Sequence, residues 1–198
     1  TGKIATTTDI RSMSVEKIDN LSIENNSIVT MTSSQAEKFK GNGITQSNDS
    51  TIRIIETSDS DFTSMNIETW NFDELLLQNT LLTLTPSQTD LLKNKSVSKS
   101  NSSIIATVSQ NTNLSLLDLS KANTINISPN VTIQINVGQA HLSLIKGSNS
   151  KTQLVTSGNE NISLINVSVD EIHNSGNLRI NVNQISIPIT NTGILILS

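Results

Sequence analysis

The sequence predicts an all-β fold, in the form of a repetitive parallel β-helix (β-solenoid) with a short helical turn in each repeat of roughly 50 residues. Three observations predict it: an internal repeat, an alternation of apolar and polar residues, and a composition almost free of rings. Aromatic residues make up 2% of the 198 residues, and tyrosine is absent. Because large rings usually fill a wide core, we expect a thin core lined by aliphatic side chains.

The internal repeat is carried by two landmarks that advance along the chain together. The first is a Thr-x-Thr-x-x-Gln segment at Thr30–Gln35 and Thr83–Gln88, with a weaker copy at Gln134–Gln139. The copies of the second landmark begin at Met13, Met65, Leu117 and Ile165. Both landmarks recur at a step of roughly 50 residues, and this agreement indicates a true repeat.

The repeats place residues 1–198 in a single elongated repeat domain. Its approximate copies are residues 13–64, 65–116, 117–164 and a partial copy at 165–198. The chain begins Thr1-Gly2-Lys3, without an initiator methionine or the positive and then apolar start of a signal peptide. We therefore expect a piece excised from a longer chain, or a protein exported without an N-terminal signal.

Each copy contains runs in which apolar and polar residues alternate, the pattern of a strand with one buried face. In the third copy this predicts strands over Leu114–Leu119, Thr124–Ile127 and Val131–Ile135, with a turn at Pro129 and Asn130. The polar partners are mainly Ser, Thr and Asn, which suit a stack in which identical positions lie about 4.8 Å apart. A series of small stacked β-sandwiches with the same period is the alternative.

A short helix interrupts the strands in each copy. Thr32–Gln35 and Thr85–Gln88 have the capping-box pattern, in which the Thr hydroxyl accepts from the backbone N–H three residues on and the Gln reaches back. Pro86 falls at the first helical position, where its missing N–H costs nothing. Asn136–Gln139 is a variant, since Asn is a good N-cap. Asn181 and Gln184 have the same spacing, but Ile185–Pro188 has the pattern of a strand, so this copy is degenerate or its match is accidental.

Composition excludes several classes of function. The chain carries 13 basic and 17 acidic residues, a net charge of −4, so it has no electrostatic reason to bind nucleic acid or anionic lipid. No segment approaches the roughly 20 apolar residues that a membrane span needs, so we expect no membrane insertion. Cysteine is absent, which removes disulfides and thiolate chemistry.

The segment Thr83–Gln88, with its partner Thr30–Gln35, lies within strands rich in Ser, Thr and Asn. It resembles the repeats of Gram-negative bacterial surface-layer (S-layer) proteins and of related type I-secreted exoproteins and adhesins. The resemblance covers about residues 13–170. It implies an extracellular cell-surface protein that assembles with copies of itself, with cell-surface polysaccharide as a further candidate partner and calcium as a candidate ion. The Gly-Gly-x-Gly-x-Asp calcium repeat is missing, so the resemblance assigns calcium to no residue.

The candidate calcium ligands come from the residues themselves. Asp49, Asp59 and Asp61 offer clustered oxygens, the hard ligands that calcium prefers. Their spacing is not that of an EF-hand, and Ser-Asp runs are ordinary turn formers, which is the interpretation we favour. His141, in a predicted short helix, and His173, in a predicted turn, are expected to be solvated or locally hydrogen-bonded histidines rather than ligands.

No catalytic residue and no cofactor is predicted. Asp118 and Asp170 lie about one repeat apart at similar repeat positions, and a pair of carboxylates could support glycoside hydrolysis at roughly 5 to 10 Å. We favour turn roles for both, and no nucleophile-elbow, P-loop or dinucleotide motif occurs.

Trp70 is predicted to be a core ring rather than a ligand platform. Trp70–Glu74 is the one candidate for an exposed binding segment.

The expected function is that of a structural component of an extracellular surface-layer lattice, which self-assembles through lateral and end-on contacts, and not that of an enzyme. The alternative is a segment of an adhesin stalk or phage fibre that binds a host glycan or protein. A carbohydrate-active β-helix enzyme is a third hypothesis. Glycosylation stays unassigned, because Asn-x-Ser/Thr sequons arise readily in this composition.

Overall fold

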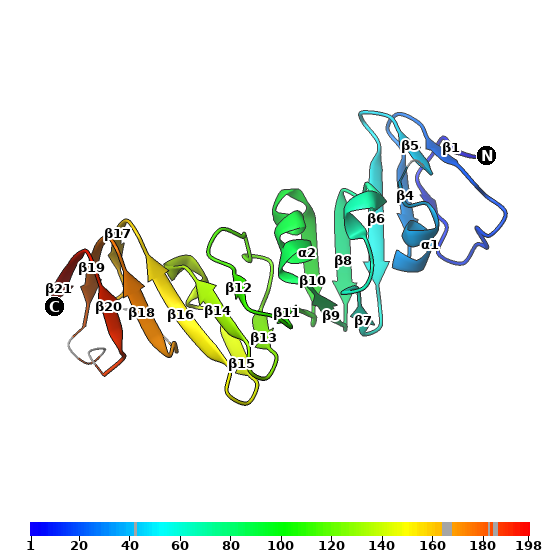
Figure 1. Cartoon of the computed structure of the whole chain (residues 1–198). Helices are drawn as coiled ribbons and strands as arrows, with labels where there is room; N and C mark the ends of the chain where they lie inside the picture. The colour runs from blue at the N-terminus through cyan, green and yellow to red at the C-terminus, as the bar shows by residue number, and fades with distance from the viewer. Residues whose placement is uncertain (42, 164–167, 182, 184–185) are drawn as a thin grey trace. The chain divides into compact units, whose positions relative to one another are not determined.

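The structure is a computed structural model that describes all residues except 42, 164–167, 182, 184 and 185. It is mostly β, with parallel sheets and a few short helices (Figure 1), which confirms the predicted all-β parallel class. The chain divides into two compact units, Thr1–Ile104 and Ile105–Ser198, which are described separately below. The single repeat domain expected from the sequence stays a prediction.

The first unit contains parallel sheets with the strand orders β1-β3-β5 and β2-β4-β6-β8-β10, and β7 pairs with β9. Its strands are β1 (Gly2–Ile4), β2 (Thr8–Asp9), β3 (Leu21–Ile23), β4 (Ile28–Met31), β5 (Ile44–Gln46), β6 (Thr51–Glu56), β7 (Ser60–Asp61), β8 (Glu74–Gln78), β9 (Leu81–Leu84) and β10 (Ser96–Ser100). Its helices are α1 (Ser33–Lys38), η1 (Ile67–Trp70), α2 (Pro86–Leu91) and η2 (Leu92–Asn94).

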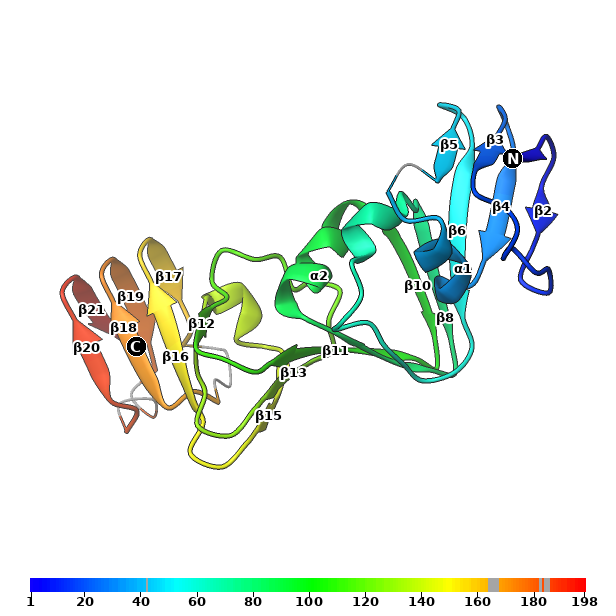
Figure 2. The ribbon, with the colours of Figure 1, turned by 45° about the vertical axis from the view of Figure 1, so that its right-hand side comes forward.

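The second unit contains parallel sheets with the orders β11-β13-β15, β12-β14-β16-β18-β20 and β17-β19-β21. Its strands are β11 (Ser103–Val108, which begins just before the unit boundary), β12 (Thr112–Asn113), β13 (Thr124–Ile127), β14 (Thr132–Ile135), β15 (Ser143–Lys146), β16 (Lys151–Thr156), β17 (Asn159–Asn161), β18 (Glu171–Asn174), β19 (Asn177–Ile180), β20 (Ile189–Asn191) and β21 (Ile194–Leu197). A 3-10 turn, η3 (Val137–Gln139), precedes β15. Figure 2 shows β16, β18 and β20 side by side.

Within a sheet, a strand pairs with the strand that the chain forms after it has turned back alongside itself. We call each such short passage of the chain a return. Ile28 on β4 pairs with Thr51 on β6, and Ile172 on β18 pairs with Ile189 on β20. Parallel pairing after so short a stretch leaves no room for a long crossover helix. Each repeat of the sequence therefore contains more than two such returns.

Period-two alternation produces a core that is largely aliphatic, as predicted. In β6 and in β11, half-buried and buried residues alternate along the whole strand. The buried residues of each unit form a cluster made largely of Ile, Leu and Val. Trp70 and Phe62 add rings to the core of the first unit, where their ring centroids lie 5.2 Å apart with the edge of one ring toward the face of the other.

The predicted strand over Leu114–Leu119 is wrong. Strand β12 ends at Asn113, and the following residues turn, because the Asn113 side chain accepts hydrogen bonds from the backbone N–H and the hydroxyl of Ser115. This local Asx-type turn competes with strand formation. The predicted strand Thr124–Ile127 is confirmed as β13, and β14 lies within the predicted Val131–Ile135.

The three predicted capping boxes are confirmed at Thr32–Gln35, Thr85–Gln88 and Asn136–Gln139. Gln184, the glutamine of the degenerate copy, lies outside the described residues. Each confirmed glutamine also makes contacts that its capping pattern does not reveal. Its amide nitrogen donates to two backbone carbonyls in a turn of the preceding return of the chain. We call this arrangement the glutamine brace.

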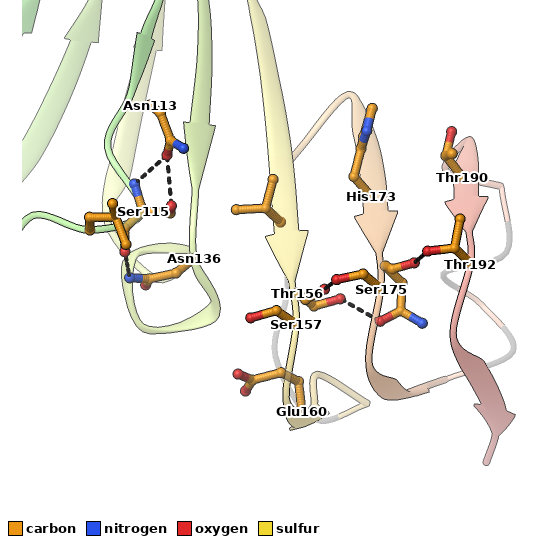
Figure 3. Close-up of a pocket in the computed structure, with 13 residues that line it drawn as sticks. Asn113, Ser115, Asn136, Thr156, Ser157, Glu160, His173, Ser175, Thr190 and Thr192 are labelled. Carbon is orange, nitrogen blue, oxygen red and sulfur yellow. Dashed lines mark hydrogen bonds between the residues drawn. The ribbon is translucent and has the colours of Figure 1, made fainter.

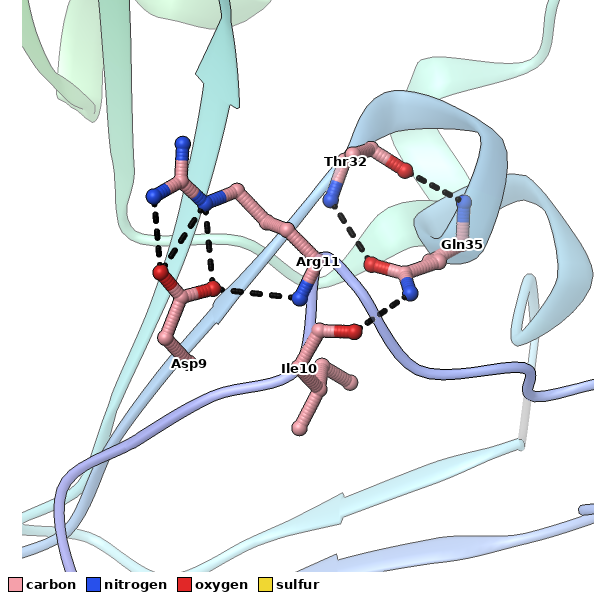
Figure 4. Close-up of polar contacts among 5 residues, drawn as sticks. All are labelled: Asp9, Ile10, Arg11, Thr32 and Gln35. Atoms are coloured by element: carbon pink, nitrogen blue, oxygen red, sulfur yellow. Dashed lines mark hydrogen bonds and ion pairs between the residues drawn. The ribbon is translucent and has the colours of Figure 1, made fainter.

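The distances of the brace are nearly the same in each copy. Gln35 Nε2 lies 2.7 Å from the carbonyl oxygen of Ile10 and 3.0 Å from that of Met13, and Figure 4 shows the first of these bonds beside the capping box. Gln88 Nε2 donates to Phe62 and Met65 at 2.6 and 2.7 Å. Gln139 Nε2 donates to Leu114 and Leu117 at 2.8 Å each. The brace therefore repeats with the period of the sequence.

One buried hydroxyl in the core of the second unit leads to a first prediction. Thr152 is fully buried on β16, and its hydroxyl has no hydrogen-bond partner among the described residues. Since an unsatisfied buried polar group costs about 1–3 kcal/mol, Thr152→Val is expected to stabilise the second unit by about 1 kcal/mol in urea unfolding followed by circular dichroism.

A matched control for Thr152→Val is Thr156→Val on the same strand. The buried Thr156 hydroxyl donates to the Asn174 side chain at 2.7 Å. Its loss is expected to destabilise the unit by about 1–2 kcal/mol. Equal effects of the two substitutions would contradict the assignment of Thr152 as the unsatisfied group.

Candidate functional site

A cavity of about 500 Å³ opens on the second unit and is lined largely by hydroxyl and amide side chains (Figure 3). One row of its lining consists of Val155, His173 and Thr190, which are in register on β16, β18 and β20. Since paired strands lie about 4.8 Å apart, these side chains form a ladder across three strands. We call this opening the polar cavity.

A second row of the lining follows two residues later, where each strand turns. It consists of Ser157, Ser175 and Thr192. The Ser175 hydroxyl donates to the carbonyl oxygen of Thr156 at 3.2 Å, and the Thr192 hydroxyl donates to that of Asn174 at 3.3 Å. Both rows line the same opening.

Beneath these rows lies a polar layer that links the three strands, buried at Thr156 and Asn174 and exposed at Asn191. Thr156 donates to the Asn174 side-chain oxygen at 2.7 Å, and the Asn174 amide donates to the Asn191 side-chain oxygen at 2.6 Å. The same Asn174 amide also donates to the carbonyl oxygens of Gly176 and Ile194. Because buried polar groups hold position best when all their bonds are made, this layer is a rigid base for the cavity.

The other side of the cavity is a loop held by the third glutamine brace. Figure 3 shows Asn113 and Ser115 on this side, together with Asn136. The Asn136 amide donates to the carbonyl oxygen of Ser115 at 2.7 Å. Gln139 holds the carbonyls on either side of that loop, at Leu114 and Leu117. The repeat element of the fold thus positions the wall of the cavity.

Charge is sparse in the polar cavity. Glu160 and His173 are the titratable groups among its lining residues, and no Lys or Arg lines it within the described chain. His173 Nε2 lies 3.1 Å from a carboxylate oxygen of Glu171, although the geometry of a hydrogen bond is not met. The hydrogen bond from Gln153, followed by the contact with His173, holds the pKa of Glu171 below its usual value.

The candidate calcium ligands are exposed, and two of them accept hydrogen bonds from other parts of the chain. Asp49 lies in an exposed turn. Asp59 Oδ1 accepts from the backbone N–H of Leu81 at 2.7 Å. Asp61 Oδ1 accepts from the hydroxyl and the backbone N–H of Thr63, and these bonds lower the pKa of Asp61. Calcium binding at Asp49, Asp59 and Asp61 stays a prediction.

Across the described residues, no group of three or more His, Asp or Glu side chains is arranged to hold a metal ion. Asp118 is exposed, and its Oδ1 accepts from the backbone N–H of Ser120 at 2.8 Å. Asp170 accepts from Lys146 Nζ at 2.9 Å and from the backbone N–H of Thr152 at 2.6 Å. Desolvation raises the pKa of Asp170, but these two contacts outweigh it, so its net pKa lies below the usual value.

The structure places the two histidines and the tryptophan singled out from the sequence in different surroundings. His141 is exposed in a turn just after η3, whereas His173 lies on β18 and not in the predicted turn. In β18, His173 is paired with Val155 of β16, a pairing that the local sequence does not reveal. Trp70 is 1% exposed and donates from Nε1 to Glu37 at 2.7 Å, as predicted for a core ring.

The segment Trp70–Glu74 does not form an exposed aromatic surface, because Trp70 and Phe72 are both buried.

The residues that line the polar cavity were not identified from the sequence. They come from strands that meet only after the chain has returned several times. No described helix is long and apolar enough to cross a bilayer.

Comparison with known proteins gives no relative of this chain. No protein-family model, curated protein or solved structure matches it. The resemblance to surface-layer repeats therefore stays a prediction that rests on the Thr-x-Thr-x-x-Gln segments.

Proposed function

We propose that this chain is a structural, self-assembling component of an extracellular surface-layer lattice, and that each unit is a stretch of parallel β-solenoid. The glutamine brace supports the solenoid, because the same side chain joins consecutive returns of the chain in three copies. The lattice and its location outside the cell rest on the sequence resemblance. Copies of the chain itself are the partners in this proposal.

The observation that carries the assembly proposal is the apolar edge at the C-terminal end of the second unit. Strand β21 is the last of its sheet, and its side chains Ile194, Ile196 and Leu197 are 59%, 38% and 53% exposed. Residues 180–198 contain no Asp, Glu, Lys, Arg or His. The N–H and C=O groups at such an edge accept a further strand, which a continuation of the chain or a second copy can supply.

The N-terminal edge of the first unit carries charged side chains. Lys3 lies on β1, and Asp9 and Arg11 form an ion pair at the end of β2, with 2.7 Å between Arg11 Nη2 and Asp9 Oδ2 (Figure 4). A strand of a second copy laid on the C-terminal edge would make the end-on contact expected from the sequence, and the proposal is tested there.

A charge on that edge is expected to weaken assembly. Ile196→Lys should lower the association constant at least tenfold, because a lysine must be desolvated when another strand pairs with β21. The measurement is weight-average mass by light scattering over a concentration series, with negative-stain electron microscopy of the same samples. Leu81→Lys is the matched control, because Leu81 is also 38% exposed but lies on β9.

Calcium is tested in the same series. Sheets or tubes that require calcium would support the lattice and direct attention to Asp49, Asp59 and Asp61. A chain that stays monomeric with and without calcium, or an equal response to both lysine substitutions, would overturn the proposal of end-on assembly. The adhesin or fibre alternative would then be favoured.

A further inference from the structure

We propose that the polar cavity of the second unit binds a short neutral oligosaccharide. The proposal does not depend on assembly through the C-terminal edge. The volume of about 500 Å³ lies within the range of about 300–1,000 Å³ that is typical of small-ligand pockets. Its base is rigid, and its wall is fixed by the third glutamine brace, so the site is preformed.

The polar groups of the cavity fall into two sets. Asn136, Ser175 and Thr192 have their side chains committed to backbone carbonyls, and they form the frame. The side chains of Ser157, Glu160 and Thr190 have no hydrogen-bond partner in the described part of the chain. These uncommitted groups supply two hydroxyls and a carboxylate to the same opening.

This combination suits a ligand rich in hydroxyl groups. Serine and threonine hydroxyls both donate and accept, as sugar hydroxyls do, and a carboxylate accepts two hydroxyl protons in strong charge-assisted bonds. With one carboxylate and no Lys or Arg among the lining residues, the cavity disfavours phosphorylated, sulfated or carboxylated ligands. The chemistry of the lining therefore favours an uncharged saccharide.

An exposed leucine at the rim supplies an apolar surface. Leu116 is 90% exposed and lines the cavity next to Ser115. The backbone carbonyls around it are held by Gln139 and Asn136, so the backbone of the loop that carries this side chain is held in place. Together with Val155 it offers a surface for the C–H face of a sugar ring.

Leu116 also breaks the repeat. The aligned residue is Ser12 in the first copy and Ser64 in the second, and both are exposed. The Asp9 and Asp61 that open those turns are replaced by Asn113 in the third. The fold itself accepts serine and aspartate here, since the braces of the first two copies have the same geometry. Leu116 and Asn113 thus make this turn more apolar and uncharged, although the fold does not require either residue.

The test uses the full chain and saturation-transfer difference NMR with four neutral probes: maltotriose, cellotriose, N,N′,N″-triacetylchitotriose and mannotriose. Transfer to at least one neutral probe is expected, whereas a heparin-derived tetrasaccharide should show none. Glu160→Gln and Leu116→Ser are each expected to weaken the binding of the neutral probe that shows transfer about tenfold or more. Titration calorimetry measures this affinity.

The control variants separate loss of the site from loss of the fold. Leu116→Ser restores the residue of the first two copies, so its circular dichroism spectrum should be unchanged. Glu68→Gln changes an exposed carboxylate of the first unit and should leave binding unaltered. The proposal is overturned if no neutral probe receives transfer, or if binding is the same in Glu160→Gln and Leu116→Ser as in the parent chain.

Discussion

Gly176→Ala is expected to destabilise the second unit by about 3 kcal/mol or more and to weaken the pairing of β18 with β16 and of β19 with β17. A Cβ at this position would overlap the carbonyl oxygen of Gly158, and it would lie 2.6 Å from the carbonyl carbon of Ser157. The obstructing atoms are backbone, so they cannot move away as a flexible side chain would.

The backbone cannot shift without breaking the strand ladder. The carbonyl oxygen of Gly158 accepts from the N–H of Asn177 at 2.8 Å, and that of Gly176 accepts from the N–H of Ile194 at 2.8 Å. Gly193 meets the carbonyl oxygen of Gly176 in the same way. A column of glycines therefore allows consecutive returns of the chain to approach closely beside the polar cavity.

Gly158→Ala is the matched control, because it belongs to the same column but lies at its start. The nearest atom to a Cβ there is the Glu160 Oε1 at 3.8 Å, which is ordinary contact. We expect a change below about 0.5 kcal/mol. The measurement is urea unfolding followed by circular dichroism, together with the fluorescence of Trp70, the single tryptophan.

Trp70 lies in the first unit, so its fluorescence should report the same midpoint in the parent chain and in Gly176→Ala. Loss of circular dichroism signal at lower urea, without a change in fluorescence, would place the damage in the second unit. Equal stabilities of the two alanine variants would show that the glycine column does not limit the approach of the strands.

Gln88→Glu is expected to destabilise the first unit by about 3–5 kcal/mol. The substitution keeps an oxygen that accepts from the Thr85 N–H, but it replaces the nitrogen that donates to the carbonyls of Phe62 and Met65. The Met65 carbonyl then loses this donor, whereas the Phe62 carbonyl keeps only the Met65 N–H. An unsatisfied buried group costs about 1–3 kcal/mol. The buried carboxylate adds desolvation and repulsion. Urea unfolding followed by Trp70 fluorescence measures the loss.

The deficit in Gln88→Glu should shrink as the pH is lowered. Burial beside two carbonyls raises the folded-state pKa of the new carboxyl, and its protonated form can donate again. The variant therefore gains stability relative to the parent chain below that pKa and loses it as the pH rises. Gln78→Glu, at an exposed position on β8, should change stability by less than about 0.5 kcal/mol at any pH. A similar loss in both variants would contradict the brace.

Much of the local structure was predictable from residues close together in sequence. A capping box needs only a Thr or Asn and a Gln three residues later, and all three confirmed boxes follow that rule. Strands such as Thr124–Ile127 need only alternation over a few residues. The same alternation was misleading at Leu114–Leu119, because a side-chain hydrogen bond at Asn113 competes with the strand.

The polar cavity was not predictable in this way. Val155, His173 and Thr190 form a row only because β16, β18 and β20 pair in a particular register. The returns between paired strands differ in length, since the return from Ile28 to Thr51 is longer than that from Ile172 to Ile189. A single residue more or less in one turn would move a side chain to the opposite face of its strand.

The sequence by itself determined the β class, the internal repeat, the capped turns and the burial of Trp70, because each depends on composition or on near neighbours. Only the tertiary structure decided which carbonyls each brace glutamine reaches, which glycines lie against the preceding return, and which side chains share the polar cavity. These contacts join residues from successive returns of the chain, and the lengths and conformations of the intervening turns set their register.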